Sequence, residues 1–502
     1  MQNSITQQAV AKYRAALPAG ELNEFALSNA DRLGIHCHSA IFYPAEGPHK
    51  GGVGYGLSPD AAQCGAYGEL TEDFWAHQAL EAWPRIHASF AELKAEKRDA
   101  IDPLDLCLEA GSLYDEHLKL DWVEIDRLGG DNVWVPLEFV ACGWSDLPEQ
   151  GNAALGPSRR GFLVTPITNG LGAGTSREMA IVHGLLELLQ RDGNGLSIRA
   201  LATGDAIDLD TIHDPVAREL LDKFEHMGVD VVVKLASTDR DIPGFYVSGT
   251  DRADAANGAS GVMALGGGEA CHPVAVVALR KALLEFAAAR ARIAFFHGPL
   301  AIAERVAPAG YLDEFRENFA PHDEEQRALE SLSAWAKLSL DEVRANMAPV
   351  HRVEKWIDFA VVPTQPEALA DDKSALLEYV VSQLRDDDLE VLVADFSPVD
   401  DEVTSVKVIV PGLEVETLSY GRIGRRNVER LIEIARAGGP ILAGIGAIMP
   451  GAQPVLLSVE AQAKLGGAAW FDADEAAKVV GPLYSIYREP GRHAVALLAD
   501  VG

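Results

Sequence analysis

Hydrophobic and polar positions along the chain follow two periods, one typical of strands and one typical of helices. Short, continuous apolar runs predict strands at 133–142, 229–237, 242–251 and 405–411. Residues 300–350 are polar with helical spacing, and residues 374–398 predict a helix followed by a buried strand. Because strands and helices alternate and no Pro/Ser-rich linker divides the chain, we predict an α+β protein with mixed sheets and flanking helices.

The two ends of the chain predict additions to this main domain. Residues 1–45 begin with a helical pattern, which predicts an N-terminal helical extension. A pair of glycines at 438–439 precedes a tail that has its own helix signals. We therefore expect a main domain over 46–437 and a C-terminal appendage over 438–502 that packs on it.

Charge and cysteine usage narrow the class of protein. The 502 residues carry a formal net charge of -32, which repels nucleic acid and anionic lipid. No apolar stretch has the length of a membrane span, and the first 20 residues lack the pattern of a secretory signal. The five cysteines are far apart, which is typical of a reducing compartment. We expect a soluble, cytoplasmic protein that binds neither nucleic acid nor membrane.

A glycine-rich turn that leads into an acidic helix occurs three times, at 51–75, 165–195 and 264–292. Glycines allow a close approach of the backbone or a positive φ. The helix that follows directs its positive N-terminal end at the turn, which is a favourable arrangement for binding phosphate. The three segments therefore suggest an anion site built from several parts of the chain.

Paired acidic or amide side chains mark the first two of these helices. Glu69 and Glu72 are three residues apart, so both lie on one helical face, although an isolated pair of this kind is also common on a solvated surface. Glu187 and Gln190 repeat the spacing. The first helix has a Ser58-Pro59 start signal, and Thr175 to Glu178 matches a capping box that predicts the start of the second. His183 reads more readily as a packed core histidine than as a site residue.

The third helix carries Lys281, Glu285 and Arg290. Lys281 and Glu285 are four residues apart and could simply form a helix-stabilising ion pair. Carboxylates beside a phosphate site would repel the phosphates unless each binds Mg2+, which prefers carboxylate oxygens. No GxxxxGK[ST] motif is present, so a P-loop is excluded. Without any resemblance to a known family, the residues thus suggest a magnesium–nucleotide site of unusual design. The pattern His36-Cys37-His38 lacks a partner pair and is a weak zinc candidate.

Taken in order, these segments resemble the signature motifs of the YcaO family. In the second segment, a loop of the form S/T-N-G-L-A-x-G enters a helix of the form E-A-I-x-H-x-L-x-E-x-x-E-R-D. The residues that match are Thr168, Asn169, Gly170, Leu171, Gly174, Ala180, Ile181, His183, Leu185, Glu187, Arg191 and Asp192. Glu69 and Glu72 match the family's E-x-x-E, and Lys281, Ala282, Glu285 and Arg290 resemble its R-A-L-x-E helix. VKVIVPGLE at 406–414, followed by Arg422 and Arg425, is similar to its P-G-L-E strand.

The resemblance implies a YcaO fold and an ATP site without a P-loop. It implies that ATP is bound by Asn169, Thr175, Arg191, Lys281 and Arg290. It implies that Mg2+ is held by Glu69, Glu72, Glu187, Gln190 and Glu285. It further implies that a peptide-backbone amide oxygen attacks ATP and leaves as phosphate. The incoming nucleophile is either a neighbouring Cys, Ser or Thr side chain, which gives an azoline, or an external sulfide, which gives a thioamide. No catalytic nucleophile is implied.

Several positions depart from the family pattern. Gln190 stands where a glutamate is usual, Met179 where a glutamate precedes alanine, Tyr55 where a lysine is common, and Lys281 where an arginine is usual. These changes could reorganise or weaken ATP binding, because lysine lacks the bidentate fork of arginine. The chain ends in 498–502 without the Pro-x-Pro-x-Pro ending of azoline-forming members, which favours a thioamide or a variant heterocyclisation.

The expected partners follow from the same resemblance. The substrate would be the precursor of a ribosomally synthesised peptide, and a leader-peptide-binding or TfuA-like protein would present it, because the chain has no fused leader-recognition domain. A homodimer or a hetero-complex is expected. The main alternative is a non-catalytic nucleotide-binding scaffold or accessory factor, which Gln190, Met179 and Tyr55 would suit. A remote alternative is a metabolic ligase similar to the ATP-grasp enzymes.

Overall fold

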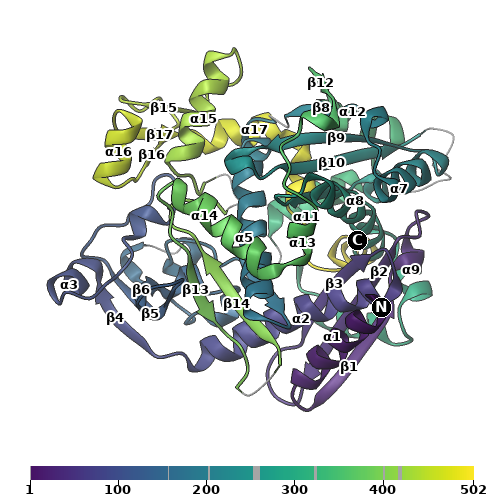
Figure 1. Ribbon diagram of the computed structural model, residues 1–502, viewed down its shortest axis with the longest axis horizontal. Coiled ribbons are helices and arrows are strands. Elements are labelled where there is room, and N and C mark those ends of the chain that lie inside the picture. The colour runs from purple at the N-terminus through teal and green to yellow at the C-terminus, as the bar shows by residue number, and fades with distance from the viewer. Residues whose placement is uncertain are drawn as a thin grey trace. The chain divides into compact units, whose positions relative to one another are not determined.

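The computed structural model describes residues 2–155, 158–201, 204–252, 261–321, 325–399, 402–415 and 421–501 (Figure 1). By its internal contacts the chain divides into two compact units that interleave along the sequence. The first unit comprises Met1–Leu70, Thr203–Glu367 and Val480–Gly502, and the second comprises Thr71–Ala202 and Ala368–Val479. Each unit is described by itself below.

The first unit contains two sheets. Its strands are β1 (Gly20–Ala26), β2 (His36–Pro44), β3 (Lys50–Gly56), β8 (Asp205–Ile207), β9 (Val229–Ser237), β10 (Gly244–Asp251), β11 (Gly267–Cys271) and β12 (Trp356–Ile357). Its helices are α1 (Gln2–Ala16), α7 (Pro215–His226), α8 (Ala275–His297), α9 (Leu300–Val306), α10 (Tyr311–Asn318), α11 (Gln326–Trp335), α12 (Leu340–His351), α18 (Tyr484–Tyr487) and α19 (Ala494–Val501). Helix α2 (Pro59–Ala82) begins in this unit and crosses into the second at Thr71.

The strands β1, β2 and β3 form an antiparallel sheet in that order. The other sheet has the order β11-β10-β9-β8-β12, in which β12 runs parallel to β8 and the remaining pairs are antiparallel. Helix α8 packs against β11 and β10 and also contacts α7 and β3. Because α8 is apolar on nearly all sides, with Ala278, Leu279, Ala282 and Phe286 fully buried, it forms the centre of the unit's core.

The second unit is built around a largely antiparallel sheet. Its strands are β4 (Arg85–Ser89), β5 (Lys119–Arg127), β6 (Val133–Pro136), β7 (Leu171–Gly174), β13 (Leu392–Asp395), β14 (Thr404–Ile409), β15 (Ala443–Ile445), β16 (Gln453–Val455) and β17 (Ala469–Phe471). Its helices, besides the second half of α2, are α3 (Phe90–Ala95), α4 (Leu137–Val140), α5 (Arg177–Asn194), α6 (Ser197–Ala200), α13 (Ala368–Asp371), α14 (Lys373–Asp386), α15 (Arg425–Arg436), α16 (Val459–Leu465) and α17 (Ala473–Val480).

The main sheet of the second unit has the order β4-β5-β13-β14-β7, with β6 paired to β5, and every pairing in it is antiparallel. A small sheet, β15-β17-β16, lies in the C-terminal part of this unit. Helix α5 packs on β7 and β14, and α14 packs on α5, as Figure 1 shows. This stack places the acidic helix α5 directly on the edge of the sheet.

The three glycine-rich segments turn out to be strands packed tightly on the helices that follow them. They form β3, β7 and β11, which precede α2, α5 and α8. A β-carbon added to the central glycine of each strand would lie between 2.0 and 2.2 Å from a backbone oxygen of that helix. These central glycines are Gly54, Gly172 and Gly268. The prediction of turns is therefore wrong for these positions, which lie in strands, and glycine there serves the close approach of strand and helix. Phosphate binding by these segments stays a prediction.

We expect Gly54→Ala to destabilise the protein by about 1–3 kcal/mol or more, because the added methyl would meet the backbone of α2 at Ala62 and Ala66. Gly68→Ala is the matched control, since nothing lies within 4 Å of a β-carbon at Gly68 in the same helix. The control should be neutral or stabilising by about 0.5–1 kcal/mol. Thermal unfolding of the two variants measures the difference, and equal midpoints would contradict this packing.

The α+β class is confirmed, and several local predictions can be compared with the structure. The strand expected at 229–237 is β9. The strand expected at 242–251 is β10, which begins two residues later, and the one expected at 405–411 is β14, whose bounds are shifted by one and two residues. The run at 133–142 is wrong in its second half, because β6 ends at Pro136 and α4 follows. The stretch before residue 45 forms β1 and β2 rather than a connector.

Helix starts and domain bounds can also be compared. Ser58 caps α2 as expected and accepts a hydrogen bond from the Ala61 amide at 3.2 Å. The capping residue of α5 is Ser176, which accepts from the Met179 amide, so the box predicted at Thr175 is displaced by one residue. The expected division into an N-terminal extension over 1–45, a main domain over 46–437 and an appendage over 438–502 stays a prediction. Within the described part of the chain, every helix is too short or too polar to span a bilayer.

Candidate functional site

Strand β3 anchors two of the predicted magnesium ligands in the first unit. The backbone amide of Val53 donates to Oε2 of Glu69 on α2 at 2.8 Å. The hydroxyl of Tyr55 donates to Oε2 of Glu285 on α8 at 2.8 Å. Val53 and Tyr55 are two residues apart on one strand, so their α-carbons lie about 7 Å apart along it. One strand thus brings together carboxylates that are more than 200 residues apart in the sequence.

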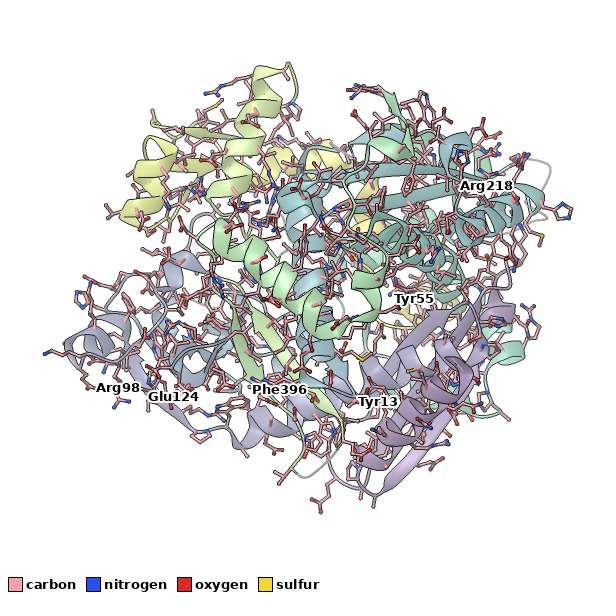
Figure 2. The ribbon with its side chains drawn as sticks, in the orientation of Figure 1. Tyr13, Tyr55, Arg98, Glu124, Arg218 and Phe396 are labelled. Carbon is pink, nitrogen blue, oxygen red and sulfur yellow. The ribbon has the colours of Figure 1, made fainter. Side chains whose placement is uncertain are left out.

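Tyr55 explains one departure from the family pattern. A lysine is common at this position, and the tyrosine, labelled in Figure 2, replaces its charge with a neutral hydroxyl that still donates a hydrogen bond to Glu285. Glu285 therefore keeps a fixed orientation but is not neutralised by an ion pair with residue 55. A carboxylate held in this way retains its negative charge for a cation.

Arg292 on α8 lies within electrostatic range of both Glu69 and Glu285. Its closest acidic partner is Glu489, at 2.8 Å, and the attraction of Glu489 raises the pKa of Arg292. Burial alone would raise the pKa of Glu489, but Arg292 and His297 together lower it to about 2. Glu489 belongs to the C-terminal segment, which thereby reaches the same cluster of charges as the two predicted ligands.

The predicted ATP-binding residues of α8 occupy different environments. Lys281 is exposed. Arg290 is only 1% exposed and forms ion pairs with Asp31 at 3.2 Å and with Asp251 at 3.0 Å. These contacts favour a role for Arg290 in the interior of the first unit, and its ATP-binding role stays a prediction.

In the second unit, Glu187 holds the turn that contains Asn169 and Gly170. Its Oε2 accepts from the Gly170 amide at 2.9 Å, and Gly170 in turn accepts from the Val408 amide of β14 at 2.8 Å. Gly170 has φ +87°, and a β-carbon there would lie 2.3 Å from the Val408 oxygen, so only glycine fits. Asn169 is nearly buried and donates its side-chain amide to the carbonyl of Val415.

The remaining candidates of this unit lie along α5 and the end of α2. Arg191 is four residues from Glu187, and their side chains form an ion pair at 3.4 Å. Gln190 is 8% exposed, whereas Thr175 is exposed. Glu72 is half-buried and its main-chain oxygen lies 3.5 Å from the Ser405 hydroxyl of β14. His183 is exposed on α5, so the core position predicted for it is wrong.

A buried ionic network behind α5 was not predicted from the sequence. Glu414, at the end of the P-G-L-E segment, pairs with Arg199 at 2.9 Å, and their side chains are 2% and 0% exposed. The Glu414 amide donates to Asp192, and Asp192 pairs with Arg426 at 3.2 Å. Two of the motif residues, Asp192 and Glu414, therefore join the end of α5 to the segment after β14. Their spacing of 222 residues gave no signal of this contact.

The predicted magnesium ligands are divided between the units, with Glu69 and Glu285 in the first and Glu72, Glu187 and Gln190 in the second. Among the described residues, no group of three or more acidic, histidine or cysteine side chains is arranged to hold a metal by itself. The donor set nevertheless fits Mg2+, because every candidate offers an oxygen, and Glu69, Glu187 and Glu285 are oriented by hydrogen bonds without being fully buried.

The chain is similar in sequence or in fold to several known proteins. An uncharacterized protein of Methanothermobacter thermautotrophicus is 28% identical over 407 residues, which cover 80% of this chain and 91% of that protein. The YcaO protein of Methanopyrus kandleri bound with AMPPCP and Mg2+ has a similar fold, with a TM-score of 0.52, 18% identity and coverage of 83% of this chain and 91% of that one.

Two further structures share the fold. A heterocyclase in complex with substrate and cofactor gives a TM-score of 0.59 at 19% identity over 82% of this chain, which spans about half (52%) of the heterocyclase. The Escherichia coli microcin synthetase McbBCD complex with pro-MccB17 bound gives 0.51 at 16% identity, covering 81% and 91%. The family model described as YcaO cyclodehydratase, ATP- and Mg2+-binding, matches residues 53–414. The chain therefore belongs to the YcaO family of ATP-dependent cyclodehydratases, whose domain binds ATP and Mg2+.

Proposed function

We propose that this protein uses ATP to activate a backbone amide of a ribosomally synthesised precursor peptide, giving a thioamide or an azoline. The observation that carries the proposal is that two residues of strand β3 hold the carboxylates of Glu69 and Glu285 by hydrogen bonds. Glu187 offers a third oriented carboxylate in the second unit. The family match over 53–414 supports the use of ATP.

The proposed reaction transfers a phosphoryl group to the peptide and then releases it. The amide oxygen attacks the γ-phosphorus of ATP and ADP leaves. A Cys, Ser or Thr side chain, or an external sulfide, adds to the activated carbon, and phosphate leaves with the original amide oxygen. The protein's part is to orient the two substrates and stabilise charge, which agrees with a site rich in fixed carboxylates. Mg2+, when bound, neutralises charge on the triphosphate.

The residue roles within this proposal remain those predicted from the sequence. Glu69, Glu72, Glu187, Gln190 and Glu285 would hold Mg2+, and Asn169, Thr175, Arg191, Lys281 and Arg290 would contact ATP. A separate leader-peptide-binding or TfuA-like protein would present the peptide, in a hetero-complex or with a homodimer of this chain in the cytoplasm. The fold shared with the microcin synthetase complex that has pro-MccB17 bound supports a peptide substrate.

Peptide-dependent release of ADP and phosphate tests the proposal. We expect purified protein, supplied with precursor peptide, partner protein and a sulfide source, to consume one ATP for each amide modified. Mass spectrometry of the peptide separates the products, because an azoline loses water and a thioamide exchanges oxygen for sulfur. Failure to consume ATP under all these conditions would sink the proposal.

A second function is favoured by the neutral side chain at Gln190, which is only 8% exposed. A site with one fewer charge would bind ATP without turning it over, and the chain would then be a nucleotide-binding scaffold or accessory factor. Calorimetry that shows ATP binding with no hydrolysis in the presence of every peptide tested would favour this reading. Release of AMP rather than ADP would instead indicate a ligase.

A further inference from the structure

The second unit contains a cavity of about 310 Å³ that involves none of the predicted ATP or magnesium residues. It lies beside the β4–β5 pair, where α4 and the segments at 147–152 and 161–162 complete its walls. Its volume falls at the small end of the range for ligand pockets. The apolar part of its lining consists of Leu120, Leu137, Leu147, Pro148 and Phe162.

Glu138 on α4 is the unusual residue of this cavity. It is 4% exposed, and its Oε2 accepts from the backbone amides of Leu163 and Val164 at 2.5 and 3.0 Å. Its Oε1 accepts no hydrogen bond from any residue that the structure describes, although the side chain lines the cavity. Oε1 is not among the enclosed atoms that lack a partner, so solvent reaches it, and a ligand that donates to it would form a charge-assisted hydrogen bond.

The two nearby cations that the structure describes, Arg422 and Lys407, form their hydrogen bonds with main-chain carbonyls and not with Glu138. Arg422 directs its guanidinium to the carbonyls of Cys107 and Leu106. Lys407 donates to the carbonyls of Ala141 and Ile167, both at 2.7 Å. Glu138 therefore forms no ion pair with these two cations, although Arg422 is near enough to lower its pKa. Glu138 lines this cavity and also a neighbouring pocket that Lys407 and Arg422 line.

A second carboxylate adds to the negative character of the cavity. Asp121 on β5 lines it and pairs with the exposed His87 at 2.8 Å. The lysine of the lining, Lys119, directs its ammonium to Glu92 at 2.8 Å, and Glu92 is not part of the lining. The cavity between α4 and the sheet thus has two carboxylates and an apolar wall. This combination is complementary to a ligand with a positive head and a short apolar stem.

We propose that this cavity binds an organic cation, an ammonium or guanidinium group on a short aliphatic stem, with its head on Glu138 and Asp121 and its stem on Leu120, Leu147 and Phe162. The site is separate from the proposed amide activation and does not depend on it. The same chemistry occurs in a free amine and in a lysine or arginine side chain of a peptide, and the test distinguishes these sources.

Calorimetry and ligand-observed NMR on the full chain, without nucleotide or partner, test the binding. The probes are n-butylammonium, the neutral 1-pentanol, and a capped Leu-Lys-Leu peptide with and without acetylation of its lysine. We expect n-butylammonium to bind with a Kd of about millimolar, as suits a ligand of so few atoms, and 1-pentanol to bind at least tenfold more weakly. Tighter binding of the unacetylated peptide than of n-butylammonium would assign the cavity to a basic side chain, and weaker binding to a free amine.

Glu138→Gln separates the proposed role from a structural one. Glutamine can still accept the Leu163 and Val164 amides, so the fold should be kept, but the charge is lost. We expect Glu138→Gln to weaken n-butylammonium at least tenfold and Asp121→Asn to weaken it several-fold. Glu124→Gln, a change to an exposed residue of the same strand β5 that is labelled in Figure 2, should leave it unchanged.

The pH dependence gives an independent readout. Burial, helped by the charge of Asp121, raises the pKa of Glu138 to about 7, although the amides of Val164 and Leu163 and the charge of Arg422 lower it. Glu138 loses its proton and becomes negative as the pH rises through 7, whereas the amine of the ligand stays protonated. The affinity for n-butylammonium should therefore increase between pH 6 and pH 8. His87 and Lys119 also face the cavity. The dependence should therefore persist in His87→Asn and vanish in Glu138→Gln. No saturable binding to the wild type, equal binding by Glu138→Gln, or equal affinity for 1-pentanol would overturn the proposal.

Discussion

Replacing Glu187 with glutamine should lower the rate of peptide-dependent ATP turnover at least about a hundredfold, which corresponds to about 2.7 kcal/mol of lost transition-state stabilisation. The amide oxygen of glutamine can accept the Gly170 hydrogen bond that Glu187 accepts at 2.9 Å, so the turn at Asn169 should keep its place. The variant removes only the negative charge. A large loss of rate would therefore report the charge, as expected of a magnesium ligand.

The control for this variant lies on the helix that packs against α5. Glu378 on α14 is exposed, and Glu378→Gln should leave ATP turnover and thermal stability unchanged. Thermal unfolding of Glu187→Gln should also stay within a few degrees of the wild type. If Glu187→Gln turns over ATP at the wild-type rate, Glu187 does not hold the metal. If both rate and stability collapse, the carboxylate serves the fold, and the proposed ligand set must be revised.

The sequence indicated which side chains are candidates for the site but not which groups hold them in place. Glu69 and Glu187 could be named as candidates because each lies at a defined position of a short motif on a helix. Their hydrogen-bond donors could not, because the amides of Val53 and Gly170 become donors only when strand and helix pack together. No local pattern encodes a contact of this kind.

The glycines show the same limit in another form. A run of glycines before a helix predicts either a phosphate turn or a close strand–helix contact, and the local sequence is identical in the two cases. The structure shows the second, since Gly54 on β3 lies against the backbone of α2. The choice depends on small residues in the facing helix, such as Ala62 and Ala66, whose partner strand cannot be read from the sequence alone.

Residues far apart in the chain but joined in the interior were also missed. Glu414 and Arg199 are an example, because nothing in the sequence around either residue indicates that they meet. Burial of a charge is set by the whole fold, and the only local hint was the position of Glu414 at the end of the P-G-L-E segment. The pair is fully enclosed in the structure, and this has a measurable consequence.

Replacing Arg199 with leucine should destabilise the second unit by about 3–5 kcal/mol, because it would leave the Glu414 carboxylate buried without its cation. Arg199 also donates to the carbonyls of Gly195 and Arg422, and these acceptors would lose a partner as well. Urea unfolding followed by tryptophan fluorescence measures the change in free energy. The double replacement Arg199→Leu with Glu414→Leu should cost less than the sum of the two single ones, because neither charge is then left alone.

Arg425→Ala is the matched control for this loss of an arginine. Arg425 pairs with Glu429 one turn along α15, at 2.7 Å, and both side chains are partly exposed, at 30% and 37%. A pair of this kind contributes about 0.3–0.5 kcal/mol, so the control should unfold close to the wild-type urea concentration. If Arg199→Leu costs no more than Arg425→Ala, the buried pair does not stabilise the join between α5 and the segment after β14. In that case the position of Glu187 depends on its contacts with Gly170 and Arg191.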